Sequence, residues 1–195
     1  MARVEEKGGL LVRFSQRWAK WKYGREIPIT PVIAHSRPNM LGWGAFEWFH
    51  DHGTKVDERL RDLAATRVAT KIGCEFCIDM ASALGRKAGV TEQQLREFHD
   101  YRTSALFSPE EKVVMEYADE LTMEQVQVSD ELFSRLRDHF DEEQIVELTT
   151  TIAIENLRSR FNNALGIAPA GFSEGMFCPM PERALEADQR VRTTA

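Results

Sequence analysis

Apolar residues recur every three or four positions along almost every patterned stretch of this chain, and strand-like alternation is nearly absent. This spacing is typical of helices that bury one face, so the sequence predicts an all-α protein. The expected helices cover residues 9–23, 40–51, 56–72, 74–87, 91–100, 109–122, 130–139 and 142–163.

Polar residues and glycines mark the ends of these helices. Thr91 to Gln94 and Ser108 to Glu111 both have the sequence of a capping box, the second with Pro109 at the first helical position. Gly73 breaks the helix that precedes residue 74. Pro28, Pro31 and Pro38 predict extended chain between the first two helices.

The 195 residues are enough for one hydrophobic core, and we expect one domain with appendages. Residues 1–39 are interpreted as a basic amphipathic arm and a proline-containing linker, residues 40–172 as the domain, and residues 173–195 as a tail. Segment 43–49 contains four large aromatic residues, more than a monomer would ordinarily expose. We therefore expect this segment or the arm to contribute to a homo-oligomer interface.

Charge is distributed unevenly. Residues 1–26 contain seven Lys or Arg and three acidic residues, a net charge of +4. The whole chain carries −6, so the remaining residues carry −10. An acidic body disfavours nucleic acid as a partner. The chain shows neither an apolar run of membrane-spanning length nor a leader pattern, so we expect no membrane span and a cytoplasmic protein. The arm either packs on protein or lies on a membrane surface, as its Trp and Lys/Arg content also allows.

The chemistry is concentrated in Cys74 and Cys77, a CxxC pair in a chain with three cysteines. Such a pair serves either dithiol redox chemistry or zinc binding. Zinc needs further ligands nearby, whereas Cys178 lies in the proline-containing tail, where we expect a free thiol. The sequence therefore favours redox chemistry, and we expect neither a metal nor a cofactor.

Positions i and i+3 of a helix share one face, so the two sulfurs should lie close enough to bridge. The helix dipole at the first turn favours thiolate, and this argument alone would make Cys74 the nucleophile. The neighbouring Glu75 and Asp79 oppose it, because a negative charge raises the pKa of a thiol.

Several segments resemble the alkylhydroperoxidase D (AhpD)-like, carboxymuconolactone decarboxylase family over residues 40–170. They are Asp62-Leu63, Gly73-Cys-Glu-Phe-Cys-Ile-Asp-Met80, Leu84-Gly-Arg-Lys-Ala-Gly-Val90, Ile145-Val-Glu-Leu-Thr, Asn156, Arg158 and Asn163-Ala-Leu-Gly166. The resemblance implies an AhpD-like helical bundle that oligomerises. It also implies a thiol peroxidase or disulfide reductase that uses a small-molecule hydroperoxide and a thiol or lipoyl-type reductant. Cys77 would then be the peroxidatic cysteine, Cys74 the resolving cysteine, and Asp62 would take the place of the relay glutamate.

The chain departs from the family pattern at two positions. Asp62 is one methylene shorter than glutamate, and Ala81 stands where the resemblance implies a relay histidine. His50 and His52 are candidate substitutes, although both also suit a solvated helix end. A non-catalytic or redox-sensing protein is therefore one alternative. Decarboxylation of a small lactone acid is a second alternative, which only the family name suggests. Glu155, Asn156 and Arg158 are expected to form a buried polar cluster or a subunit contact.

Overall fold

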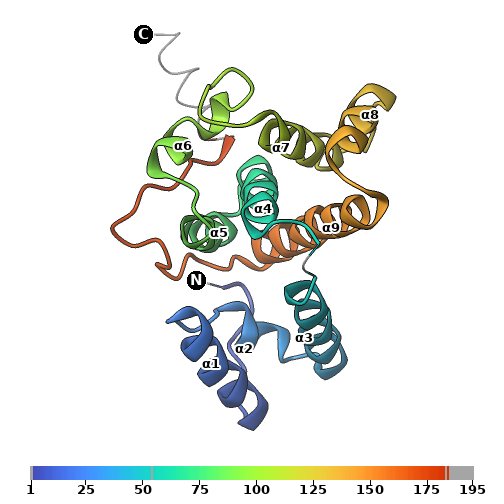
Figure 1. Ribbon diagram of the computed structural model, residues 1–195. Coiled ribbons are helices and arrows are strands. Elements are labelled where there is room, and N and C mark those ends of the chain that lie inside the picture. The colour runs from blue at the N-terminus through green and yellow to red at the C-terminus, as the bar shows by residue number, and fades with distance from the viewer. Residues whose placement is uncertain (1, 54, 183, 185–195) are drawn as a thin grey trace.

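The computed structural model describes residues 2–53, 55–182 and 184, and all regular structure in them is helical (Figure 1). The helices are α1 (Leu10–Tyr23), α2 (Ile29–Ile33), α3 (Arg37–Asp51), α4 (Glu58–Ile72), α5 (Glu75–Lys87), α6 (Glu92–Arg96), the short 3₁₀ helix η1 (Phe98–Asp100), α7 (Pro109–Leu121), α8 (Asp130–His139) and α9 (Glu142–Leu165). The expected all-α fold is confirmed.

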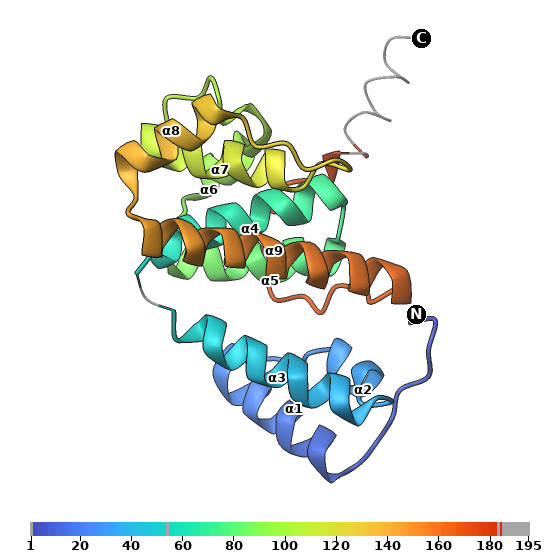
Figure 2. The ribbon, with the colours of Figure 1, turned by 90° about the vertical axis from the view of Figure 1, so that its right-hand side faces the viewer.

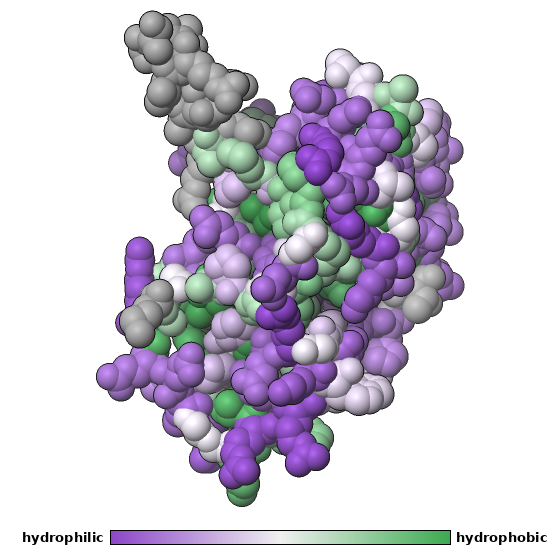
Figure 3. All heavy atoms as spheres, turned by 90° about the vertical axis from the view of Figure 1, so that its left-hand side faces the viewer, coloured by the Kyte–Doolittle hydropathy of each residue, from purple (hydrophilic) through white to green (hydrophobic). Residues whose placement is uncertain are grey.

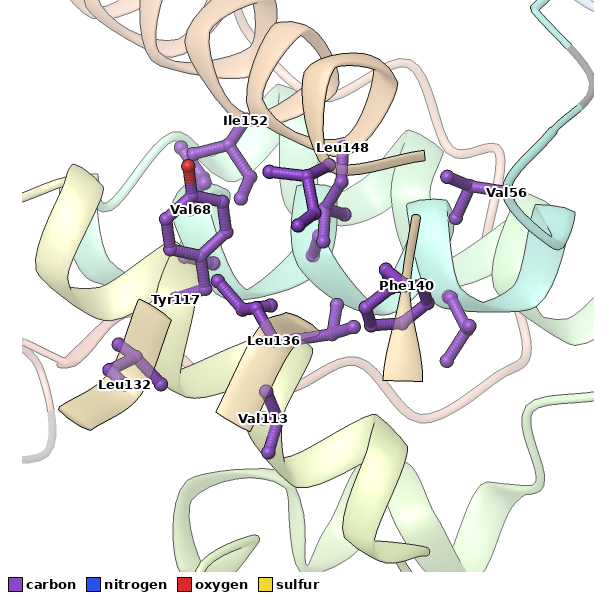
Figure 4. Close-up of a cluster of buried hydrophobic side chains, with 14 residues drawn as sticks. Val56, Val68, Val113, Tyr117, Leu132, Leu136, Phe140, Leu148 and Ile152 are labelled. Carbon is purple, nitrogen blue, oxygen red and sulfur yellow. The ribbon is translucent and has the colours of Figure 1, made fainter. Parts of the chain in front are cut away.

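Helix α4 lies at the centre and packs against α5, α7 and α9 (Figure 1). Its apolar residues, including Leu60, Ala64 and Val68, form the main core together with side chains from α7, α8 and α9. Figure 4 shows Leu148 and Ile152 of α9 pointing toward this core from one side and Leu136 of α8 from another. Apolar burial on this scale is the dominant stabilising term of the domain.

Helices α1 to α3 form a separate layer beneath α9 (Figure 2). Helix α3 joins this layer to the domain along α9: the rings of Trp43 and Phe161 lie 5.2 Å apart, and His50 Nε2 bonds Thr151 Oγ1 at 3.2 Å. No helix in the described part of the chain is long and apolar enough to cross a membrane.

Two local predictions were wrong. The prolines do not keep the chain extended, because Pro28 caps α2 and Pro38 lies in the first turn of α3. First-turn N–H groups have no partner within a helix, so proline is tolerated there. The helix expected over 91–100 is interrupted: α6 ends at Arg96, and a 3₁₀ turn begins at Phe98, whose side chain is fully buried.

After α9 the chain turns back at Gly166 and runs along the outside of α5 toward α4 and α6; we call residues 167–182 the strap (Figure 1). Asp79 of α5 anchors it by accepting hydrogen bonds of 2.7 to 3.0 Å from the backbone N–H groups of residues 170 to 173. The ring of Phe177 lies 4.5 Å from the Arg96 guanidinium. Residues 173–182, expected as part of a tail, thus pack on the domain, whereas residues 183 and 185–195 of that tail lie outside the described residues.

Candidate functional site

Both cysteines lie where α5 begins. Gly73 ends α4 in the left-handed conformation (φ 75°), which glycine adopts without strain, and this turn places Cys74 at the N-cap of α5. The Cys77 N–H donates to Cys74 Sγ at 3.3 Å, and the two sulfurs are 2.7 Å apart. The structure thus brings together the two residues that the CxxC spacing singles out.

The two thiols differ in acidity. The hydrogen bond with the Cys77 side chain lowers the pKa of Cys74 and outweighs its burial, with help from the Cys77 backbone N–H. Burial raises the pKa of Cys77, and the hydrogen bond to Cys74 raises it further. Cys74 is therefore the more acidic thiol of the pair. Both side chains are enclosed, with Cys74 1% and Cys77 5% exposed.

A row of polar side chains on α9 faces this pair. Glu155, Ser159 and Asn162 follow one another at helical spacing, and all three are buried. Asn162 Nδ2 donates to Cys77 Sγ at 3.3 Å, and Ser159 Oγ donates to Glu155 Oε1 at 3.0 Å. Glu155 is also close enough to the Cys77 thiol for each group to shift the pKa of the other. The dithiol is thus in contact with an acid, a hydroxyl and an amide.

Burial raises the pKa of Glu155 above that of an ordinary glutamate, although Arg158, Cys77 and Ser159 each lower it in part. Arg158 Nη1 lies 3.3 Å from Glu155 Oε2, while its Nε donates to Glu47 Oε1 at 2.8 Å. One guanidinium thus serves two carboxylates, and the full charge of Glu155 is not neutralised. A carboxyl in this position can take up and release a proton nearer neutral pH than a solvated one.

Glu155 was expected in a polar cluster with Arg158 and not beside the cysteines, and Ser159 and Asn162 were not predicted from the sequence as site residues. The signal was present, because three polar residues at positions i, i+4 and i+7 occupy one face of the last helix. What the sequence lacked was the partner of that face, since α5 and α9 meet only through tertiary packing.

Asp62 lies elsewhere. Its Cβ packs on α5 near Gly85, eight residues beyond Cys77 and about 12 Å along the helix axis. Burial raises its pKa to about 7, and Oδ2 has no hydrogen-bond partner among the residues that the structure describes. A relay role for Asp62 stays a prediction from the resemblance.

The other residues named for the relay are also placed. Ala81 is buried one turn after Cys77. His50 contacts Thr151, one turn before Glu155 on α9, and burial lowers its pKa. His52 Nδ1 bonds the Trp48 carbonyl at 2.6 Å on the exposed surface.

Cys178 lies in the strap, partly exposed, and Sγ–H donates to Ser173 Oγ at 2.8 Å. Within residues 2–53, 55–182 and 184, no three His, Cys, Asp or Glu side chains come together as a metal site. Two hollows adjoin the helices of the dithiol site. One of about 250 Å³ lies beside α5, and one of about 280 Å³ lies between α3 and α9, with Trp43, Ile154 and Arg158 in its lining. The second hollow reaches Arg158, whose other contact, Glu155, adjoins Cys77.

Known proteins share both the sequence pattern and the fold. The pattern of the carboxymuconolactone decarboxylase family matches residues 38–120. The uncharacterized protein YnjA of Escherichia coli K12 is 35% identical over 136 residues, which are 70% of this chain and 72% of YnjA.

Among solved structures, an alkylhydroperoxidase AhpD core from Ralstonia eutropha JMP134, described as an uncharacterized peroxidase-related protein, superposes with a TM-score of 0.70 at 20% identity. The match covers 86% of this chain and 92% of that one. The debrominase Bmp8 gives 0.75 at 16% identity, covering 88% and 92%. At these identities the likeness concerns the fold, and it confirms the AhpD-like helical arrangement.

Proposed function

Because this chain belongs to the carboxymuconolactone decarboxylase family, we propose that it is a dithiol oxidoreductase of the AhpD-like type that reduces a small hydroperoxide with Cys74 and Cys77. The observation that carries the proposal is the 2.7 Å separation of the two sulfurs, next to a buried carboxyl that can move a proton. Oxidation of two thiols this close requires little movement of the backbone.

The first step is attack by the thiolate of Cys77 on the terminal oxygen of the hydroperoxide. The O–O bond breaks, the sulfur becomes a sulfenic acid, and the departing alkoxide takes a proton to become an alcohol. The thiolate of Cys74 then attacks the sulfenic sulfur, forming the 74–77 disulfide and releasing hydroxide, which leaves as water after protonation. A thiol or lipoyl-type dithiol reductant returns the pair to its starting state by donating two electrons and two protons.

Glu155 supplies the proton transfers in this proposal. Its carboxylate accepts the proton of Cys77 before the attack and returns it to the alkoxide afterwards. The buried Ala81 offers no base, so an acid reaching Cys77 from α9 takes the part that the resemblance gives to a histidine of α5. Asn162 supports the same assignment, because its N–H donates to the sulfur that must become negative.

The order of the two cysteines is the part most open to test. The resemblance and the contacts of Glu155 and Asn162 favour attack by Cys77, whereas the lowered pKa of Cys74 favours the reverse. Cys77→Ser and Cys74→Ser are compared after treatment with one equivalent of cumene hydroperoxide and a sulfenic-acid trap. Cys178→Ser is the matched control.

We expect trapped sulfenic acid on Cys77 in the Cys74→Ser protein and none in the Cys77→Ser protein. Trapping on Cys74 instead would reverse the order. Absence of sulfenic acid and of disulfide in every variant and in the wild type would exclude peroxide as the substrate.

A further inference from the structure

A second polar cluster lies between α4 and α7, and Asp119 of α7 is at its centre. Asp119 is buried and faces three cations: Arg67 Nε at 2.6 Å, Arg102 Nη2 at 2.7 Å and Lys71 Nζ at 3.5 Å. The Tyr101 hydroxyl donates to it at 2.7 Å. A single carboxylate thus neutralises only part of the positive charge in this cluster.

Arg67 is the most enclosed of the cations, with 5% of its side chain exposed. Its Nε is paired with Asp119, and its Nη2 lies 2.5 Å from Glu182 Oε1. Its Nη1 is buried and has no hydrogen-bond partner within the described parts of the chain. A guanidinium presents its N–H groups as a planar fork suited to two oxygens of one anion, so an enclosed guanidinium with an unused N–H can accept a larger anion than one carboxylate.

The surrounding residues favour the same kind of ligand. The guanidinium carbons of Arg67 and Arg102 lie 5.3 and 4.7 Å from the centre of the Tyr101 ring, which holds both groups in place. His99 of η1 adjoins Arg67, Glu182 and the backbone of Met180. The three cations face two carboxylates, Asp119 and Glu182, so the cluster carries a net charge of +1 with Glu182 in place and +2 without it.

Glu182 belongs to the strap, whereas Arg67 and Lys71 lie on α4 and Arg102 in the turn after η1. The rest of the strap has its own anchors at Asp79 and beneath Arg96, so its last residues can leave while the earlier part stays bound. Figure 3 views the molecule from the side on which the strap lies, where hydrophilic residues surround a central band of more hydrophobic ones.

We propose that Arg67, Lys71 and Arg102 form a binding site for a small oxyanion of the phosphate or carboxylate type, and that Glu182 occupies this site until such an anion displaces it. The site goes beyond the dithiol function and does not depend on it. Displacement loosens the end of the strap beyond Phe177, where Glu182 contacts Arg67.

The test compares the full-length wild type with Glu182→Gln by titration with inorganic phosphate, at constant ionic strength maintained with chloride. Removing a competing internal ligand raises the fraction of sites that are open, so we expect Glu182→Gln to bind phosphate about fivefold more tightly. Arg102→Gln should bind about threefold more weakly, because it removes a cation whose side chain is 55% exposed and whose loss the fold can tolerate. Succinate in place of phosphate distinguishes a carboxylate ligand from a phosphate ligand.

Two matched controls separate the site from general charge effects. Glu174→Gln removes an exposed carboxylate from the same strap, where it pairs with Arg25, and Arg135→Gln removes an exposed arginine that pairs with Glu116. Both should bind phosphate like the wild type.

Three results would overturn the proposal: neither phosphate nor succinate binding to the wild type or to Glu182→Gln, equal tightening in Glu174→Gln, or binding unaffected by Arg102→Gln. None of these measurements depends on peroxide turnover. A failure here and a failure of the dithiol proposal can therefore be told apart.

Discussion

Glu155 of α9 interacts with the Cys77 thiol of α5 in the interior of the protein, and burial raises the pKa of this glutamate. Asn162, two turns further along α9, donates to the same sulfur. We propose that these partners on α9 activate the thiol in place of a base on the cysteine helix itself.

Replacing Glu155 by glutamine should slow the reaction with peroxide by about 10²-fold, the lower end of what a positioned proton acceptor contributes. Glutamine keeps the size of the side chain but cannot accept the proton. Stopped-flow measurement with cumene hydroperoxide gives the rate, and circular dichroism confirms that the variant is folded. Glu143→Gln, at an exposed position on the same helix, should react like the wild type. An equal rate in a folded Glu155→Gln protein would remove Glu155 from the mechanism.

Asp62→Asn should change stability in a pH-dependent way. The pKa of Asp62 is raised from 3.8 to about 7 in the folded protein, so its protonated form favours folding. The wild type should have the full benefit below pH 4 and lose it as the pH rises toward 7. Asparagine mimics the protonated acid at every pH, so the variant should be more stable by about 1–3 kcal/mol at pH 8 and equally stable at pH 4. Urea unfolding at the two pH values tests this, and a difference that is the same at both would contradict it.

The same variant tests the relay role that the resemblance gives to Asp62. Because Asp62 packs near Gly85 and not at the cysteines, we expect the peroxide rate of Asp62→Asn to stay within about threefold of wild type. A loss comparable with that of Glu155→Gln would instead assign the relay to Asp62.

Ala81→His should raise the peroxide rate about tenfold, because position 81 is one helical turn after Cys77 on the same face. Ala81 is buried, so the larger polar ring should also lower stability by roughly 1–3 kcal/mol. Ala83→His, at a half-buried position of the same helix, is the control and should leave the rate unchanged. A slower or equal rate in folded Ala81→His would mean that the lack of a base at position 81 does not limit the reaction.

The protein should be a homo-oligomer. Phe14 and Trp21 of α1 are 71% and 81% exposed, and Phe49 of α3 is 68% exposed, more apolar surface than a monomer ordinarily leaves in water. Deleting residues 1–26 should therefore lower the number of subunits per particle, as measured by sedimentation at micromolar concentration. A wild-type monomer would contradict the prediction. Binding to anionic vesicles that the deletion abolishes would assign the exposed face of α1 to a membrane surface.

Local signals in the sequence predicted much of the fold. The capping boxes at Thr91 and Ser108 are formed as expected, and Gly73 ends α4 where its break was predicted. These features depend on residues a few positions apart, which is why they can be read from the sequence. The early prolines were wrongly predicted to lie in extended chain, because the sequence alone does not distinguish a proline in the first turn of a helix from one in extended chain.

The contacts of the candidate site were also predictable from the sequence only where the residues lie a few positions apart. The spacing of Cys74 and Cys77 determined that their sulfurs would meet, since both lie in one helical turn. The contact of Asn162 with Cys77 spans 85 positions, and that of Ser173 with Asp79 spans 94. Long-range contacts of this kind depend on how α9 and the strap pack on α5, which no local pattern specifies.

The central claim is that Cys74 and Cys77 act together as a redox dithiol, and peptide mass mapping after peroxide treatment tests it most directly. The reduced protein is exposed to one equivalent of peroxide, alkylated and digested without reductant. We predict a disulfide that joins Cys74 to Cys77, with Cys178 recovered as the alkylated thiol. A bridge between Cys178 and either cysteine, or three alkylated thiols after peroxide has been consumed, would contradict the account.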